Sequence, residues 1–217
     1  MQLMSRLSMV SGLAALSGVL LLFSGSLSAA PYTVDPAKSS VVVQVFKEGV
    51  ASGLAHDHVI KATQLSGKVE YDPTNASTAA ISVEVKTSGL QVDAPALRKQ
   101  YNLTSELSES DRKQVEDNMK SEAQLNVSKF PTLTFKSKSI TFSGDKAQVT
   151  GDLTIRGVTR SVSFPATVKL DGSTFVGEGK LKVKQTDYGF EPYSALLGAI
   201  KNQNEVILNL KIVGNPG

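Results

Sequence analysis

Between residues 130 and 213 the chain alternates apolar and polar side chains in one strand-length run after another. In the run 148–155, for example, every second position carries an apolar residue or a glycine, and the positions between are polar. A period of two is typical of a half-buried antiparallel strand, because successive side chains point to opposite faces. Such runs, with no helical stretch long enough to serve as a crossover among them, predict a curved sheet that closes on itself.

Eight strands are predicted in all, and the segments between them are rich in turn residues. Ser143-Gly144-Asp145 and Asp171-Gly172-Ser173 separate neighbouring runs closely enough to form hairpins. The apolar phase switches near residues 137–139, which predicts a β-bulge. The chain is therefore expected to be an all-β, eight-stranded antiparallel barrel. The predicted strands cover residues 41–46, 65–71, 81–87, 132–142, 147–155, 160–170, 174–185 and 205–213.

Two segments depart from the strand pattern. Residues 90–127 are charged and helix-forming, with Ser108 and Asp111 spaced to cap a helix, so a helical excursion is expected between the third and fourth strands. Residues 188–204 form a loop with unusually many apolar side chains. Both segments are expected to fold over an opening of the barrel.

Residues 1–30 show the charged, apolar and small-residue order of a secretory signal peptide, with Arg6 ahead of an apolar stretch. Cleavage would leave one domain, residues 31–217, exported to the periplasm. No later stretch is apolar enough to span a membrane. Loss of Arg6 leaves 22 basic against 20 acidic side chains, a bias too weak to predict binding to nucleic acid or to anionic membranes. The chain has no cysteine, so no disulfide supports the fold.

The inward phase of the predicted strands is apolar and contains Gly67, Gly151, Gly177 and Gly179. An eight-stranded barrel either fills with side chains or holds one small ligand. Glycines on the inner face either make room for a ligand or let strongly coiled strands bend, and the sequence leaves both interpretations open. The candidate ligand-binding residues of this face are Val69, Ile81, Val83, Phe135, Gly151, Leu153, Ile155, Val162, Phe164, Gly177, Gly179, Leu181 and Leu208.

The two histidines of the chain both lie in the element His56-Asp57-His58. In an extended segment His56 and His58 face the same side and are able to reach one metal ion, although further ligands would be needed. The alternative is that Asp57 accepts backbone hydrogen bonds in a turn while the histidines line the barrel mouth or bind a ligand head group. The interpretation without a metal is preferred. His56, Asp57 and His58 are therefore candidate contacts for a ligand head group, and no metal site is predicted.

Catalysis finds little support. The chain lacks a Gly-x-Ser-x-Gly elbow, a His-Glu-x-x-His pair and a phosphate-binding glycine loop before a helix. No catalytic residue and no cofactor are predicted, and the protein is expected not to be an enzyme.

Three segments carry a resemblance to a known family. They are Tyr32-Thr33-Val34-Asp35-Pro36-Ala37-Lys38-Ser39-Ser40-Val41, Phe130-Pro131-Thr132-Leu133-Thr134-Phe135-Lys136-Ser137 and Gly151-Asp152-Leu153-Thr154-Ile155-Arg156-Gly157-Val158-Thr159. In this order the chain resembles the YceI-like, polyisoprenoid-binding family of exported bacterial proteins. The resemblance implies a lipocalin-like barrel whose apolar tunnel holds an isoprenoid lipid, such as a polyprenyl compound or a prenylated quinone.

The leading hypothesis is therefore a periplasmic carrier for an isoprenoid-type lipid. One rival is a metal- or heme-linked enzyme or sensor that uses His56, Asp57 and His58. Another is a structural or stress-related interaction protein whose barrel is filled by side chains. The sequence leaves open whether the protein forms a homodimer.

Overall fold

The structure is a computed structural model that describes residues 30–217. The predicted signal peptide, residues 1–30, lies outside the described residues except for Ala30, which begins the first strand. The proposed cleavage and the domain boundary at residue 31 therefore stay predictions.

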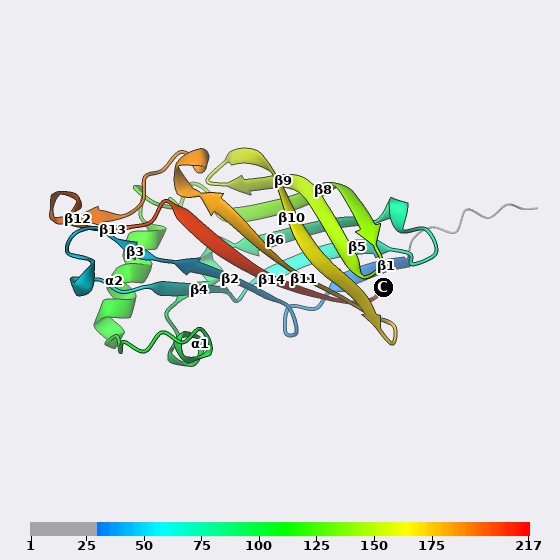
Figure 1. Cartoon of the computed structure of the whole chain (residues 1–217), viewed down its shortest axis with the longest axis horizontal. Helices are drawn as coiled ribbons and strands as arrows, with labels where there is room; N and C mark the ends of the chain where they lie inside the picture. The colour runs from blue at the N-terminus through cyan, green and yellow to red at the C-terminus, as the bar shows by residue number, and fades with distance from the viewer. Residues whose placement is uncertain (1–29) are drawn as a thin grey trace, which may run out of the picture.

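Eight antiparallel strands form a closed barrel, as predicted (Figure 1). Each strand pairs with the next in the order β1, β5, β6, β8, β9, β10, β11 and β14, and β14 pairs back with β1. The bounds are β1 (Ala30–Val34), β5 (Leu65–Tyr71), β6 (Ala80–Lys86), β8 (Thr132–Ser143), β9 (Lys146–Ile155), β10 (Val158–Asp171), β11 (Thr174–Lys184) and β14 (Glu205–Pro216).

Local chemistry explains the meander from β8 to β11. Arg156 and Gly157 connect β9 to β10 in a two-residue loop with φ of 51° and 73°. Two positive φ angles match the twist of a tight hairpin, and glycine adopts one of them without a steric penalty. The predicted bulge is confirmed, because the register between β8 and β9 shifts between Ser137 and Ser139.

The first predicted strand does not belong to the closed ring, which corrects the sequence prediction. The ring uses β1, which pairs with residues 214–216 of β14. β2 (Ser40–Val45) pairs with residues 207–211 of β14, farther from the C-terminal end of that strand. The side chain of Asp35 accepts the backbone N–H groups of Ala37 and Lys38, so the chain turns between the two strands. β2 then continues the sheet through β4 (His58–Ala62) and β7 (Leu90–Val92).

The helices and a small second sheet lie mostly at one end of the barrel. Helix α2 (Glu109–Lys120) begins at the capping box predicted for Ser108 and Asp111, and it shares its end of the barrel with the three-stranded sheet (Figure 1). That sheet consists of β3 (Lys47–Glu48), β12 (Ser194–Ala195) and β13 (Ile200–Asn202). The short helices are α1 (Pro95–Gln100), η1 (Ser52–Leu54), η2 (Ala76–Thr78), η3 (Thr87–Gly89), η4 (Gln185–Tyr188) and η5 (Leu196–Gly198).

Helix α1 packs outside the barrel. Its Leu97 contacts Val42 and Val59, which are almost completely buried on the outer face of β2 and β4. The main core lies on the other side of the sheet, inside the barrel. Within residues 30–217, no helix has the length and apolar character needed to cross a membrane.

Candidate functional site: an apolar tunnel inside the barrel

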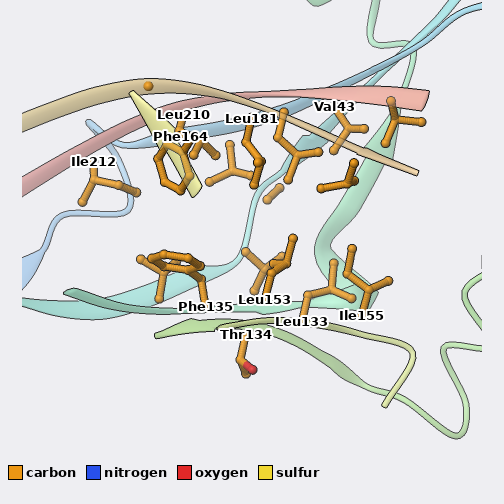
Figure 2. Close-up of a pocket in the computed structure, with 18 of the residues that line it drawn as sticks. Val43, Leu133, Thr134, Phe135, Leu153, Ile155, Phe164, Leu181, Leu210 and Ile212 are labelled. Carbon is orange, nitrogen blue, oxygen red and sulfur yellow. The ribbon is translucent and has the colours of Figure 1, made fainter. Parts of the chain in front are cut away.

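The barrel encloses a cavity of about 310 Å³ lined almost entirely by aliphatic and aromatic side chains. Figure 2 shows two facing walls: Phe164, Leu181 and Leu210 lie opposite Phe135, Leu153 and Leu133. The inward phase of the strands builds these walls, because every second residue of each strand points to the lumen. The cavity is an apolar tunnel along the barrel axis, since residues from both ends of the barrel border it.

Aromatic rings close the end of the tunnel near the C-terminus. The ring of Tyr71 lies 5.6 Å from that of Phe142 and 5.6 Å from that of Phe175, measured between centroids. Tyr32 from β1 joins them, 5.8 Å from Phe175. Tilted and edge-on contacts of this kind are favourable for aromatic pairs. This end of the tunnel is therefore a packed aromatic plug.

The opposite end carries His58 and most of the amide groups that border the cavity, and it is covered by α2. Val115, Asn118 and Met119 of this helix border the cavity, as the predicted lid requires. Gln185 and Asn202 add two further amides at this end. We call this end of the tunnel the mouth.

The apolar loop 188–204 behaves only in part as predicted. Phe190 and Tyr193 border the cavity, in agreement with a covering role. Leu196 and Leu197 do not cover the opening, because their side chains are in solvent, with 66% and 109% of their reference surface exposed. The prediction of a covering loop is therefore wrong for Leu196 and Leu197.

Most residues of the predicted inner face border the tunnel. Gly151 and Val162 do not border it, and neither do His56 and Asp57. Val162 packs against the core from a partly buried position, near the mouth-side end of β10. The predicted residues that border the cavity are Val69, Ile81, Val83, Phe135, Leu153, Ile155, Phe164, Gly177, Gly179, Leu181, Leu208 and His58.

Two of the four inner glycines are needed for close approach of neighbouring strands. A Cβ atom on Gly67 would lie 2.3 Å from the carbonyl oxygen of Ser82, and one on Gly151 would lie 2.5 Å from that of Lys136. Real Cβ atoms do not approach backbone that closely, so these glycines permit strong coiling of the sheet. At these two positions the bending interpretation is correct.

The other two glycines lie beneath aromatic rings. A Cβ on Gly177 would lie 3.1 Å from the ring of Phe175, and one on Gly179 would lie 3.2 Å from the ring of Phe164. The rings rest against the wall over the missing side chains. The glycines thus supply space that Phe164 and Phe175 occupy, and the lumen beside these rings stays open.

A buried ionic network stands at the mouth. His58, the first residue of β4, borders the cavity, and its Nδ1 atom lies 2.5 Å from Oδ2 of Asp93. Asp93 is fully buried and also accepts hydrogen bonds from the backbone N–H of Val59 and from Arg98 at 2.8 Å. An ionised carboxylate only accepts, so Nδ1 of His58 carries the hydrogen and the other ring nitrogen is left for a different partner.

The surroundings keep Asp93 ionised. Burial raises the pKa of the Asp93 carboxyl, but hydrogen bonds and attraction from His58, with further hydrogen bonds from Val59 and Arg98, lower it by more. The net pKa lies below the usual value of 3.8. The guanidinium of Arg98 compensates the buried negative charge and also donates to the carbonyl oxygens of Asp57 and Ser105.

The element His56-Asp57-His58 does not converge on one point. Nδ1 of His56 contacts the Ser105 hydroxyl, Asp57 accepts the backbone N–H of Lys47, and His58 turns to Asp93. No cluster of three or more potential metal ligands is found within residues 30–217. Asp57 accepts a backbone hydrogen bond as predicted, but from Lys47 of β3 and not within a turn, and only His58 of the three residues borders the tunnel.

Sequence reasoning missed Asp93 and Arg98. They belong to the charged segment 90–127, for which a helical excursion is predicted, and both side chains are buried. One sequence cannot show that the segment following β7 folds back on β4, where His58 lies. The positive φ of 51° at Asp93 places it in a turn conformation that aspartate tolerates better than most residues.

Comparison with known proteins identifies relatives of this barrel. Residues 32–213 match the family model described as the YceI-like domain. The chain is 27% identical to "Protein YceI" of Salmonella arizonae over 153 residues, which are 67% of this chain and 68% of that protein. BcnA of Burkholderia cenocepacia shares the fold, with a TM-score of 0.63 and 23% identity, over 83% of this chain and 98% of that one. A Campylobacter jejuni YCEI protein has a TM-score of 0.55 and 17% identity, over 73% and 84% of the two chains.

Proposed function

This chain belongs to the YceI-like family, and on that premise we propose that it is a periplasmic, non-enzymatic carrier or reservoir for an isoprenoid-type lipid. Family membership and the barrel fold support lipid binding in general. The finer proposal, a polyprenyl compound or prenylated quinone held in the periplasm, rests on the tunnel and on the sequence of residues 1–30.

The observation that carries the proposal is the apolar tunnel of about 310 Å³. Burial of one methylene contributes about 0.8 kcal/mol, so a five-carbon isoprene unit gains roughly 3–4 kcal/mol before costs. Association costs on the order of 4–15 kcal/mol in lost freedom and ordering. Several isoprene units therefore give net binding without any directional contact along the chain.

The polar groups set the orientation of the lipid. One end of the tunnel is the aromatic plug, where rings dominate and where the polar groups that border the cavity include the Tyr71 hydroxyl and Glu70. The mouth offers the imidazole of His58 and the amides of Gln185 and Asn202. We place the isoprenoid tail toward the plug and the head group at the mouth, with His58 as its hydrogen-bond partner.

The test is to isolate the protein from the periplasm of its own cells and to extract it with organic solvent for mass spectrometry. One mole of prenyl lipid per mole of protein is expected. A His58→Gln variant keeps a polar side chain at the mouth and should hold less of the same lipid. Recovery of only trace lipid from a correctly folded sample contradicts the proposal.

The rival hypotheses receive less support. A metal or heme site needs several ligands that converge, whereas His56, Asp57 and His58 have separate partners. A purely structural barrel needs a filled interior, whereas this interior holds a continuous cavity. Metal analysis of untagged protein and of a His56→Ala/His58→Ala variant distinguishes the first rival from the carrier.

A further inference from the structure

The exposed apolar surface of the molecule is concentrated at one place. Among the described residues, six large hydrophobic side chains are exposed, and five of them belong to segments at the end of the barrel that contains the mouth. The five residues are Tyr193 (38%), Leu196 (66%), Leu197 (109%), Val50 (98%) and Leu54 (75%). Large apolar groups collected at one place on a surface mark an interaction site more often than scattered ones do.

These residues stand on a defined projection, which we call the arm and which consists of residues 47–54 and 193–202 (Figure 1). β13 pairs with β3, and the N–H of Ala51 donates to the carbonyl of Ala199 at 2.9 Å. Gly49, at φ of 109°, allows this approach, because a Cβ there would lie 2.4 Å from the Ala199 oxygen. The hydrogen bonds join the two loops, so Val50 and Leu197 belong to one structural unit.

The backbone of the arm is strained where its leucines protrude. Leu196 and Leu197 have φ of 51° and 54°, a left-handed conformation that residues with a branched side chain rarely adopt. Packing of the side chains does not offset this backbone strain, since both leucines are largely in solvent. Unfavourable backbone combined with unfavourable exposure indicates a state that is completed by a partner.

The arm is continuous with the tunnel. Tyr193 and Asn202 belong to the arm and also border the cavity at its mouth. A lipid that enters or leaves through the mouth therefore passes beside the arm. The apolar residues stand on loops that project from the end of the barrel (Figure 1), so they are able to insert into a soft apolar phase.

We propose that the arm inserts into the surface of a lipid bilayer and so positions the mouth for transfer of the lipid. The inference rests on the proposed carrier function. Leucine and valine tips would enter the acyl region, while Tyr193, at the base, is suited to the headgroup level. The charges of the arm are already satisfied: Lys201 pairs with Glu48 at 2.7 Å, and Lys47 donates to the Ala55 carbonyl. Binding should therefore depend on apolar contact and little on salt or on anionic lipid.

The test measures binding of full-length mature protein, freed of lipid, to phosphatidylcholine vesicles by flotation. A Leu196→Ser/Leu197→Ser variant should bind at least about tenfold more weakly, because full burial of one leucine side chain alone corresponds to roughly that factor or more. A Leu170→Ser variant is the matched control, since Leu170 is exposed (37%) at the opposite end of the barrel. The control should bind vesicles like the wild type, and adding salt should change neither result.

A second measurement separates this inference from the carrier function. Uptake of a fluorescent prenyl analogue from detergent-free solution reports the tunnel and should be equal in all three proteins. Normal uptake without vesicle binding by the wild type overturns the arm proposal and leaves the carrier function standing. Vesicle binding that requires the leucines, with no uptake by any protein, supports the arm and contradicts the carrier. If the leucines instead drive dimerisation in sedimentation experiments and no vesicle binding occurs, the proposed occupant is wrong.

Discussion

Replacing Asp93 by asparagine should destabilise the fold through a charge left alone in the interior. Asparagine keeps the size of the side chain, tolerates the positive φ at this position and still accepts the N–H of Val59. It removes the negative charge 2.8 Å from Arg98, whose side chain is only 6% exposed. Breaking a buried ion pair by removing one partner costs about 3–5 kcal/mol.

Such a loss is large compared with a total stability of about 5–15 kcal/mol. Urea unfolding followed by circular dichroism measures it, because the chain has no tryptophan for fluorescence. With an m-value of about 2 kcal/mol per molar, the midpoint falls by roughly 1.5–2.5 M. Asp117→Asn is the control, since Asp117 pairs with Lys113 on the exposed face of α2 and its loss should leave the midpoint unchanged.

An Asp93→Asn/Arg98→Met double variant completes the design. It removes both buried charges, so it should recover part of the stability that the single variant loses. A loss of less than about 1 kcal/mol of unfolding free energy in the single variant would refute the reasoning, because breaking an ion pair as buried as this one costs more than that. It would mean that water or another group compensates Arg98.

Three further results are expected. Folding lowers the pKa of Asp93, so the contribution of its charge to stability is complete well above 3.8, the unfolded value, and is lost as pH falls through the folded pKa. The difference in urea midpoint between wild type and Asp93→Asn should therefore disappear below the folded pKa. A difference that stays constant from neutral to strongly acidic pH contradicts this assignment. Gly151→Ala should cost about 1–3 kcal/mol because its Cβ meets backbone at 2.5 Å. Gly177→Ala, which meets only a ring at 3.1 Å, should cost less, and equal thermal shifts for the two would argue against the close-approach explanation. Ile81→Phe fills part of the tunnel and should reduce extracted lipid several-fold, whereas Ser82→Phe, on the outer face of the same strand, should not.

The sequence predicted the barrel well where local pattern and local turns agree. The hairpins from β8 to β11 have strict alternation and short glycine turns, and both features act over neighbouring residues. β1 and β4 were missed because each has only five residues, too few to show a period. Their place in the sheet is decided by pairing with distant strands, which no short window contains.

The site was predicted in its walls and not in its polar end. Alternation placed Phe135, Leu153 and Leu181 on the lumen, and all three border the tunnel. His58 was singled out, but its partner Asp93 lies 35 positions away and meets it only through tertiary contact. The exposure of Leu197 was not predicted, because the sequence alone does not show whether the core or a partner covers an apolar side chain.

The double pairing of β14 divides the protein into parts that are free to diverge separately. Near its C-terminal end, β14 closes the ring through β1, and farther back it carries β2, and through β2 also β4 with His58. A change in β2, β4 or α2 therefore alters the mouth of the tunnel while the pairing that closes the ring is kept. An exchange of residues 40–62 and 90–127 with those of another barrel on this scaffold should therefore change the mouth and keep the strand pairs that close the ring.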